Sequence, residues 1–300
     1  MKKIDISFVL FSISLLLFIA GCRTTHVAGP EPITLHPKPT LSQVKKSLSP
    51  HPSAQQLPSA LGGLIQSDRW VIYKDKQQEE FSGHVFYDNG TYVFRADYAL
   101  SDRAHGTLSA RENVYLRQNN PDGSFYQAQA DKAFYNYNTQ QGTLQSNGKS
   151  RIKLISRDAK GQLLTATARK AQLDINKKIY ILEKDVQLER ISSQGTQTVT
   201  AKKATLKQLQ NYILLEGNAV VTDGKRTLTA DTIVYDAENN TSHAYGARPL
   251  AQGITEQGEF AVIADEIQSD AAGNQIQLNG KVQGWFVSPQ INDSKINTKF

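Results

Sequence analysis

The chain has 300 residues, of which 39% are hydrophobic and 21% charged, with a formal net charge of +6 and a single cysteine. This length favours one large or two small folded units. One cysteine excludes an internal disulfide framework, a four-cysteine zinc site and a CxxC redox pair. The positive charge permits an anionic partner without identifying it.

The N-terminus has the pattern of an export signal. Two lysines precede an apolar run from Ile6 to Ala20, which at about 15 residues is shorter than the roughly 20 that a bilayer-spanning helix needs. Small residues stand just before Cys22, in a pattern that resembles a bacterial lipobox. We expect a lipoprotein signal peptide over residues 1–21 and lipidation of Cys22, with an uncleaved anchor helix as the alternative. Either would tie the rest of the chain to a membrane outside the cytoplasm.

The next segment has the composition of a tether. Seven of the ten prolines lie between Pro30 and Pro58, and no apolar periodicity runs among them. This composition predicts a lipid-anchored, Pro-rich linker over residues 22–66. As a flexible coil it would span roughly 35 Å.

The remainder of the chain has the pattern of β-strands. Short segments of alternating apolar and polar residues recur over residues 67–287, separated by turn signals such as Asn89-Gly90 and Asp223-Gly224. These signals are typical of tight β-hairpins. We therefore expect an all-β domain of about thirteen to sixteen strands, followed by a polar C-terminal tail over residues 288–300.

The β region contains an internal repeat. A signature of small residues, Ala-x-x-Ala or Ala-x-x-Ile, occurs six times at intervals of 29 to 38 residues. In several units a turn and a second strand with a central glycine follow, as at Gly217 and Gly280. A unit of this size cannot bury its apolar face alone, so we expect neighbouring units to stack. The six copies begin at Ala96, Ala130, Ala168, Ala201, Ala230 and Ala264.

The repeat resembles that of a known family. The pattern A-D-x-A-x-Y-[DN], followed after about ten residues by L-x-G-x-V, is similar to the OstA-like repeat of lipopolysaccharide-transport proteins, the LptA/LptC group and the periplasmic domain of LptD. Two positions depart from the pattern, because Arg169 and Lys202 replace the usual acid. In addition, the third unit lacks the central glycine and has Glu183-Lys184-Asp185-Val186 instead. The closest stretches are residues 130–138, 201–222, 230–237 and 264–282.

This resemblance implies a fold, a function and partners. It implies a twisted, open β-jellyroll built from stacked antiparallel strand repeats. It implies a periplasmic component of lipopolysaccharide or lipooligosaccharide export, here lipid-anchored to the inner or outer membrane of a Gram-negative-type envelope, which holds lipid A acyl chains in an apolar β-trough. Edge-strand pairing would join it to other Lpt-type β-jellyroll proteins, and an export ABC transporter or an outer-membrane assembly barrel would be a partner. The alternative is a non-catalytic scaffold or adhesin-type surface lipoprotein with a filled β-core.

The alternating faces supply candidates for an apolar trough. Each candidate would equally suit the ordinary core of a β-sandwich, because both have the same sequence pattern. The candidates are Leu173, Ile175, Val186, Leu188, Ala204, Leu206, Ile213, Leu215, Ala219, Val221, Ile233, Tyr235, Ile276, Leu278 and Val282.

Charge is segregated along the chain. Residues 151–210 hold 13 Lys and Arg against 5 Asp and Glu, whereas residues 211–300 hold 6 against 11. The basic part could contact lipid phosphates or an acidic partner, or it could be a set of solvated strand faces. The candidate phosphate contacts are Arg169, Lys170, Lys202 and Lys203.

Catalytic signatures are missing from the sequence. It contains no GxSxG elbow, no HExxH and no P-loop, and its six histidines are scattered. We therefore expect no enzyme activity, no metal or other cofactor, and no nucleic-acid partner. Stacked repeats could bring recurring aspartates together, as a polysaccharide-cleaving site would need, but a turn or ladder role with Arg169 and Lys202 as ion-pair partners is simpler. The recurring aspartates are Asp97, Asp131, Asp231 and Asp265.

Overall fold

The computed structural model describes residues 63–148, 150–159, 161–192, 195–210, 212–236, 239, 241–255, 258–270 and 275–287. The expected signal peptide, Cys22, nearly all of the expected linker and the expected C-terminal tail lie outside the described residues. The first described strand begins at Leu64, inside the segment expected as linker. No helix in the described part of the chain is long and apolar enough to cross a membrane.

The described residues form one 20-stranded antiparallel sheet, which confirms the all-β prediction. A single turn of 3-10 helix, η2 (Gln208–Gln210), interrupts it. Twenty strands exceed the expected number because many units break one strand into two where the chain turns a corner. Eight strands run through that corner unbroken: β3 (Gln78–Asp88), β4 (Tyr92–Asp102), β5 (Thr107–Asn119), β6 (Phe125–Asn136), β11 (Ile179–Ser192), β12 (Gly195–Lys207), β13 (Tyr212–Thr222) and β14 (Arg226–Asp236).

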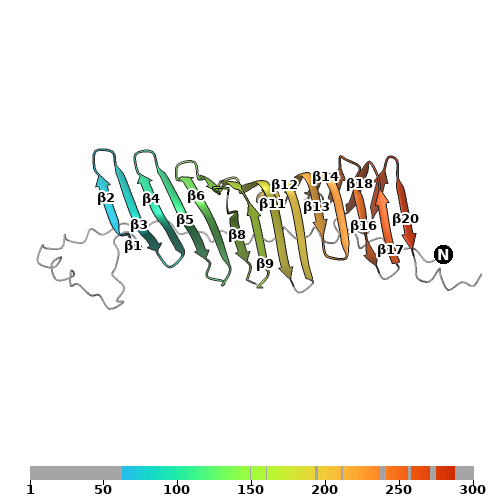
Figure 1. Ribbon diagram of the computed structural model, residues 1–300, viewed down its shortest axis with the longest axis horizontal. Coiled ribbons are helices and arrows are strands. Elements are labelled where there is room, and N and C mark those ends of the chain that lie inside the picture. Colours follow the sequence, from blue (N-terminus) through green and yellow to red (C-terminus); the bar gives the residue numbers. More distant parts are fainter. Residues whose placement is uncertain are drawn as a thin grey trace, which may run out of the picture.

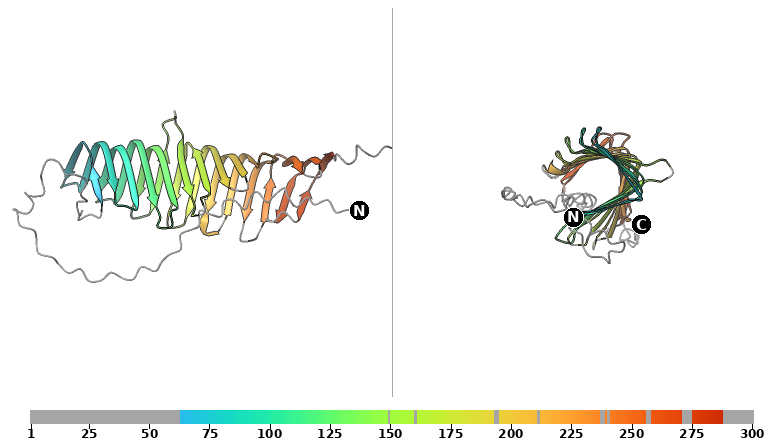
Figure 2. Two further views of the ribbon diagram at one scale, coloured as in Figure 1. Left: turned by 90° about the horizontal axis from the view of Figure 1, so that it is seen from below. Right: turned by 90° about the vertical axis from the view of Figure 1, so that its left-hand side faces the viewer.

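The corner divides the sheet into two halves, each completed by shorter strands. Half-sheet A adds β2 (Arg69–Tyr73), β7 (Gln141–Gln145), β10 (Lys170–Asp174), β15 (Thr241–Tyr245), β18 (Glu266–Asp270) and β19 (Ile276–Asn279). Half-sheet B adds β1 (Leu64–Gln66), β8 (Ile152–Arg157), β9 (Leu163–Ala168), β16 (Leu250–Thr255), β17 (Gly258–Ile263) and β20 (Gln283–Val287). The strands follow one another along a single long axis (Figure 1). Seen end on, the array is curved and open on one side (Figure 2).

The repeated alanines lie where the two half-sheets meet. In the second copy of the signature, Ala130 pairs with Val114 in half-sheet B, whereas Ala133 pairs with Ala110 in half-sheet A. Five of the six copies have a first alanine that is at most 8% exposed, and four alanines of the signature are fully buried: Ala168 and Ala264 as first alanines, Ala171 and Ala204 as second alanines. Side chains on the inside of the corner have little room because the half-sheets approach each other there, and alanine fits that space.

The strand opposite each signature carries a two-residue bulge. Glu112 and Asn113 of β5 both have positive φ, 63° and 54°, and together they oppose Asp131 of β6. The same irregularity appears in the pairings of β3, β11, β12 and β13. A two-against-one bulge bends a strand and increases its local twist. The corner therefore results from a β-bulge that is repeated along the array, and not from a break in strand pairing.

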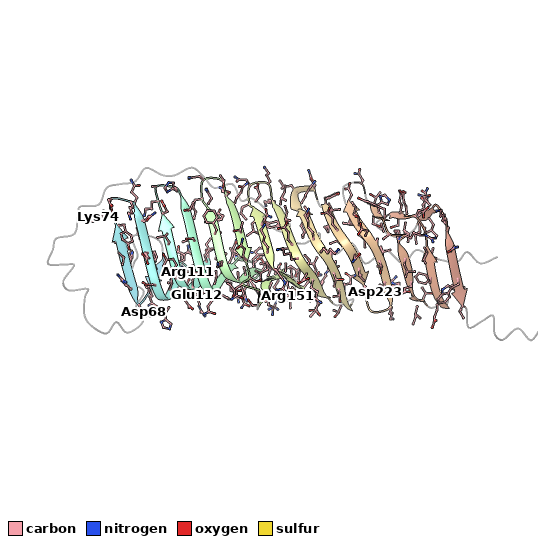
Figure 3. The ribbon with its side chains drawn as sticks, turned by 45° about the horizontal axis from the view of Figure 1, so that its top comes forward. Asp68, Lys74, Arg111, Glu112, Arg151 and Asp223 are labelled. Atoms are coloured by element: carbon pink, nitrogen blue, oxygen red, sulfur yellow. The ribbon has the colours of Figure 1, made fainter. Side chains whose placement is uncertain are left out.

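The residue directly after the first alanine of each signature points outward. In three copies it contacts the residue sixteen positions later in the sequence. Asp97 accepts a hydrogen bond from Asn113 at 2.7 Å, and Asp131 accepts one from the backbone N–H of Asn147 at 2.6 Å. Where the acid is replaced by Arg169, the bulge carries Asp185, and Arg169 Nε donates to it at 2.8 Å. The polarity of the pair is reversed while its position is kept. Asp68, Glu112 and Arg151 follow one another along this corner (Figure 3).

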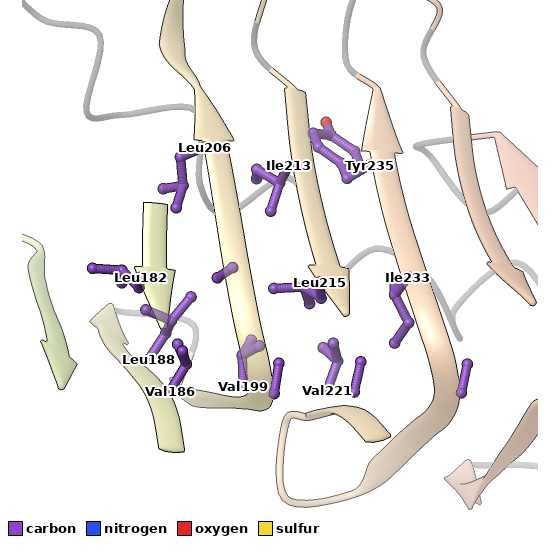
Figure 4. Packing of buried hydrophobic residues seen from close by; sticks show 14 of the residues in the cluster. Leu182, Val186, Leu188, Val199, Leu206, Ile213, Leu215, Val221, Ile233 and Tyr235 are labelled. Carbon is purple, nitrogen blue, oxygen red and sulfur yellow. The ribbon is translucent and has the colours of Figure 1, made fainter. Parts of the chain in front are cut away.

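The inside of the array is a continuous apolar layer. Its largest cluster runs from Leu144 to Ile267, and a smaller one between Phe81 and Val114 is joined to it through Ala133. In the middle of the array, side chains from both half-sheets face one another, for example Leu206 and Ile213 on one side and Val199 and Val221 on the other (Figure 4).

The geometry of the bulge predicts that one glycine substitution lowers the free energy of unfolding by a large amount. Gly217 has φ +81°, and a Cβ there would lie 2.7 Å from Cδ and 2.8 Å from Cβ of Lys202. Gly224→Ala is the matched control, because Gly224 has φ +86° with nothing within 4 Å of an added Cβ. Both changes should cost about 1–2 kcal/mol for the left-handed conformation, and Gly217→Ala about 1–3 kcal/mol more for the clash. The free energy of unfolding is measured by urea denaturation. Equal losses for Gly217→Ala and Gly224→Ala would contradict the prediction and show that the corner accommodates a larger side chain.

Candidate functional site

Four rows of side chains line the inside of the array and run its whole length. Strand pairing places one residue of each strand in each row, so the rows can be followed from β1 and β2 to β19 and β20. The two rows beside the corner are mostly buried and mix alanine with larger apolar side chains. The two rows farther from it decide whether the inside is open or filled.

The outer row of half-sheet A consists of residues that pair in register from one strand to the next. In chain order it reads Ile72, Glu79, Ser101, Leu108, Tyr135, Gly142, Leu173, Tyr180, Leu206, Ile213, Tyr235, Ser242, Ser269 and Ile276. The corresponding row of half-sheet B reads Ile65, Tyr87, Phe94, Leu116, Ala128, Leu154, Ala166, Leu188, Val199, Val221, Leu228, Ala251, Val262 and Gly284.

The two rows are exposed at one end and closed in the middle. From β12 to β16, their members are all below 9% exposed, as Leu206, Val199 and Leu228 illustrate. We call residues 195–255 the closed segment. From β3 to β8 the same rows are half-buried, and Leu116 is 43% exposed although it lies on the inner face. We call residues 78–157 the open segment.

Side-chain size accounts for this difference. Beside the corner of half-sheet A, three neighbouring strands of the open segment each contribute an alanine, Ala99, Ala110 and Ala133. The closed segment instead places Leu215 and Ile233 in consecutive strands of that row. The larger side chains fill the inside of the closed segment, whereas the alanines leave Leu116 uncovered.

The fifteen residues expected to line a trough fall into three groups. Two of them, Ile175 and Val282, are 39% and 49% exposed and lie outside the apolar cluster. Three are half-buried and pack against the cluster: Leu173, Ile276 and Leu278. The other ten are buried members of it: Val186, Leu188, Ala204, Leu206, Ile213, Leu215, Ala219, Val221, Ile233 and Tyr235. Most of the expected set therefore lies in or beside the closed segment.

The four expected phosphate contacts lie at the corner or on the outer side of half-sheet A. Lys170 pairs with Glu183 at 3.1 Å, and Lys203 pairs with Glu216 at 3.0 Å. Arg169 pairs with Asp185, whose pKa it holds below the ordinary value of 3.8 by donating a hydrogen bond. The side chain of Lys202 lies over Gly217. Phosphate binding by these cations stays a prediction, and three of them would have to leave a carboxylate.

Two other cations face inward. Arg190 of β11 and Arg226 of β14 share the parity of Leu188 and Leu228 on their strands, so they stand on the inner side of half-sheet B, farther from the corner. Arg226 pairs with Asp223, and both side chains are about 15% exposed. Burial lowers the pKa of Arg190 below its ordinary value. Sequence reasoning did not single out these two, although Arg190 alternates with Leu188, and Arg226 with Leu228, along uninterrupted stretches of strand.

Polar side chains occupy the end of the inner rows at β3 and β4. Glu79 lies in the outer row of half-sheet A, where Arg103 forms an ion pair with it. Beside it, Asp102 accepts hydrogen bonds from Gln78 Nε2 at 2.7 Å and from the backbone N–H of His105 at 3.0 Å. These bonds, the first above all, lower the pKa of Asp102 from 3.8 to about 2.

Both ends of the array expose edge strands with large apolar side chains. At one end β1 and β2 pair only with β3, and Trp70 and Ile72 are 48% and 56% exposed. At the other end β20 pairs only with β17, and Trp285 and Val287 are 54% and 51% exposed. An unpaired edge offers backbone groups to a strand of another chain.

The recurring aspartates do not gather into one site. They succeed one another along the corner, where Asp97 contacts Asn113 in the bulge of β5 and Asp131 contacts Asn147 in the connection between β7 and β8. Asp265 lies 3.8 Å from Arg248. In the described part of the chain, no three His, Cys, Asp or Glu side chains are grouped as a metal site would require.

Comparison with known proteins connects this architecture to one family. Residues 192–241, which include β12, β13 and β14 of the closed segment, match the family described as LptA/(LptD N-terminal domain) LPS transport protein. This match confirms the resemblance that the repeat indicated. No curated protein matches the chain. A solved structure of LptH, described as the LptA homologous periplasmic component of the conserved lipopolysaccharide transport device from Pseudomonas aeruginosa, aligns at 16% identity over 39% of this chain and 79% of that chain, with a TM-score of 0.33.

The hydrogen bonds of Asp102 predict a loss of stability in acid. Because its pKa is lower in the folded chain, its contribution is present above pH 3.8 and is lost as the pH falls through about 2. Asp102→Asn should therefore lower the melting temperature at pH 5 more than at pH 2. Asp75→Asn, at an exposed turn, is the control. A difference between Asp102→Asn and the parent chain that does not change with pH would contradict the assignment.

Proposed function

We propose that the chain is a lipid-anchored periplasmic component of lipopolysaccharide or lipooligosaccharide export, and that the open segment holds acyl chains. The observation that carries this proposal is the apolar inner face, whose clusters run from Phe81 to Ile267 yet leave Leu116 43% exposed. The match of residues 192–241 to a lipopolysaccharide-transport family supports the substrate class.

Acyl chains suit the open segment for a physical reason. Each methylene buried against apolar side chains contributes about 0.8 kcal/mol, and the alanines beside the corner leave depth for a hydrocarbon chain. The strands of the open segment stand about 4.8 Å apart, so the face from β3 to β8 offers roughly 20 Å along the array. That length accommodates a fatty acyl chain lying along the inner rows.

The inward arginines suit the phosphates of the same substrate. Arg190 stands on the inner side of half-sheet B in β11, between the open and closed segments, where a saccharide headgroup would lie beside acyl chains held in the open segment. Arg226 faces inward in the closed segment and is paired with Asp223. A planar guanidinium binds phosphate through two parallel hydrogen bonds. This assignment adds to the four corner cations, of which Arg169, Lys170 and Lys203 have carboxylate partners that compete with a phosphate.

Membrane attachment and partner joining complete the proposal. Acylation of Cys22 would tether the domain, and the linker would let it stand away from the bilayer. The exposed edges at β2 and β20 suit strand addition, in which main-chain hydrogen bonds extend the sheet into a neighbouring module. Other Lpt-type β-jellyroll proteins are the proposed neighbours, with an export ABC transporter or an outer-membrane assembly barrel at the ends.

One observation favours the second candidate function, a scaffold or surface lipoprotein with a filled core. The closed segment has no exposed apolar side chain in its inner rows, so this part alone would not hold a ligand. The open segment distinguishes the two functions, because a scaffold gains nothing from an exposed Leu116 on an inner face.

A photo-crosslinker tests the open segment directly. Introduced at Leu116, it should label glycolipid in cells, because this side chain is exposed on the inner face. At Tyr115, the neighbouring residue on the outer face, it should label none. At Ile233, which is 2% exposed in the closed segment, labelling should be weak or absent. Equal labelling at Leu116 and Tyr115 would contradict the proposed ligand site.

The exposed edge at β20 gives a second prediction. Replacing Trp285 and Val287 together by lysine should abolish crosslinking of β20 to a neighbouring jellyroll module, because charged side chains on an edge strand oppose pairing. Val282→Lys is the matched control, since Val282 is 49% exposed but precedes β20. The folded chain should keep its melting temperature, because the replaced side chains are exposed. The proposed edge would be ruled out if crosslinking persisted in the double lysine variant and was lost in Val282→Lys.

A further inference from the structure

The outer face of half-sheet B carries an unusual distribution of charge. In strands β3 to β9 four cations point outward from it, Arg95, Arg117, Lys153 and Arg157, against one acid, Asp88. From β11 to β20 the described strand positions on the same face hold no lysine or arginine and are rich in threonine. We call the four cations and their strands the cationic face.

These cations have no carboxylate partner within the described part of the chain, and Arg117 Nε donates to the neutral Asn119 Oδ1 at 2.8 Å. None of the four forms an ion pair with a carboxylate in the described part of the structure. In contrast, Lys170 and Lys203 on the outer face of half-sheet A are each paired with a glutamate. Half-sheet A thus pairs two of its outward cations, although Arg111 and Lys132 on that face form no ion pair in the described part of the chain, whereas none of the four outward cations in β3 to β9 of half-sheet B is paired.

Aromatic rings hold two of the guanidinium groups against the sheet. Arg95 lies between Phe86 and Tyr115, with its Cζ 5.6 Å and 5.5 Å from the two ring centres. Arg117 lies over Phe125 at 4.1 Å. Stacking of this kind contributes about 0.5–1 kcal/mol at an exposed site, and it leaves the N–H groups at the ring edges available to an anion.

The size and shape of the face point to an extended anionic surface. Lys153 and Arg157 are four residues apart on β8, about 13 Å at 3.3 Å per residue. Arg95 on β4 and Lys153 are three strands apart, about 14 Å at 4.8 Å per strand. The cations thus cover an area of several lipid headgroups on the outside of a sheet, turned away from the inner rows.

We propose that the cationic face docks on the surface of a bilayer that contains anionic phospholipid, with the four cations over lipid phosphates. Charge complementarity carries this choice, because a single lysine or arginine near an anionic bilayer surface improves binding about fivefold. Phenylalanine and tyrosine at the same level suit the headgroup region, where aromatic side chains are enriched. The proposal concerns a different face from the one that holds acyl chains, so it does not rest on the proposed export function.

Lysine footprinting of the full chain tests it. The chain is reconstituted in vesicles of phosphatidylcholine alone, or of phosphatidylcholine mixed with phosphatidylglycerol, without any glycolipid. An amine-reactive reagent is then applied, and labelled peptides are quantified by mass spectrometry. Lys153 should be labelled about fivefold more slowly on the anionic vesicles, whereas Lys132, exposed on the other half-sheet, should not change. Raising the salt from about 0.1 M to about 1 M should restore labelling of Lys153, because it shortens the Debye length to about 3 Å.

Two variants sharpen the test. Arg95→Gln combined with Arg117→Gln should restore labelling of Lys153 on anionic vesicles. Arg111→Gln is the matched control, because Arg111 also lies over a ring, Tyr98, at 4.0 Å, but on half-sheet A. Unchanged melting temperatures would establish that both variants fold. Equal labelling of Lys153 on the two kinds of vesicle, or protection by glycolipid micelles or an acidic protein but not by anionic bilayers, would overturn the proposal.

Discussion

The corner between the two half-sheets is the constraint on which the rest of the structure depends. Two residues with positive φ on one strand oppose a single residue on the next, and this bends each long strand through the same line. Alanine on each side of the bend lets the half-sheets approach closely. The contact between the outward residue and the bulge sixteen residues later then secures each bend to its neighbour, as Asp97 with Asn113 shows. Without the corner, the sheet would be flat and would have no inside.

The geometry of the corner determines the properties of the inner face of the array. The units share a similar bend, so the amount of room depends on side-chain size, above all in the row beside the corner of half-sheet A. Large residues fill the closed segment, and alanines leave the open segment with Leu116 uncovered. The proposed ligand binding would thereby use a different part of the array from the filled core, and the proposed partners would use the edges of β2 and β20. The outer faces differ as well, because half-sheet A pairs Lys170 and Lys203 with glutamates, whereas the four outward cations of β3 to β9 in half-sheet B form no ion pair in the described part of the chain.

Sequence reasoning predicted the repeat, the strand alternation and the ladder of outward residues, because each is a local pattern. Arg169 forms an ion pair as expected, but with Asp185 and not with one of the recurring aspartates, and Lys202 is in no ion pair of the described residues. Other features could not be predicted. The bulge at Lys184-Asp185 has φ of 65° and 56°, and it contains no glycine that would indicate positive φ in the sequence. Asp68 begins the ladder through His84, but Ser67 stands in place of the first alanine and hides that unit. The open segment has the same alternation as the closed one, so only the structure distinguishes them.

Hydrogen–deuterium exchange of the full chain with and without purified lipopolysaccharide tests the central claim most directly. If acyl chains lie along the inner rows of the open segment, backbone amides of β4, β5 and β6 should exchange more slowly with the ligand present. Those of β12, β13 and β14, already enclosed in the closed segment, should not change. Protection confined to β12, β13 and β14, or no protection at any saturating concentration, would contradict the account.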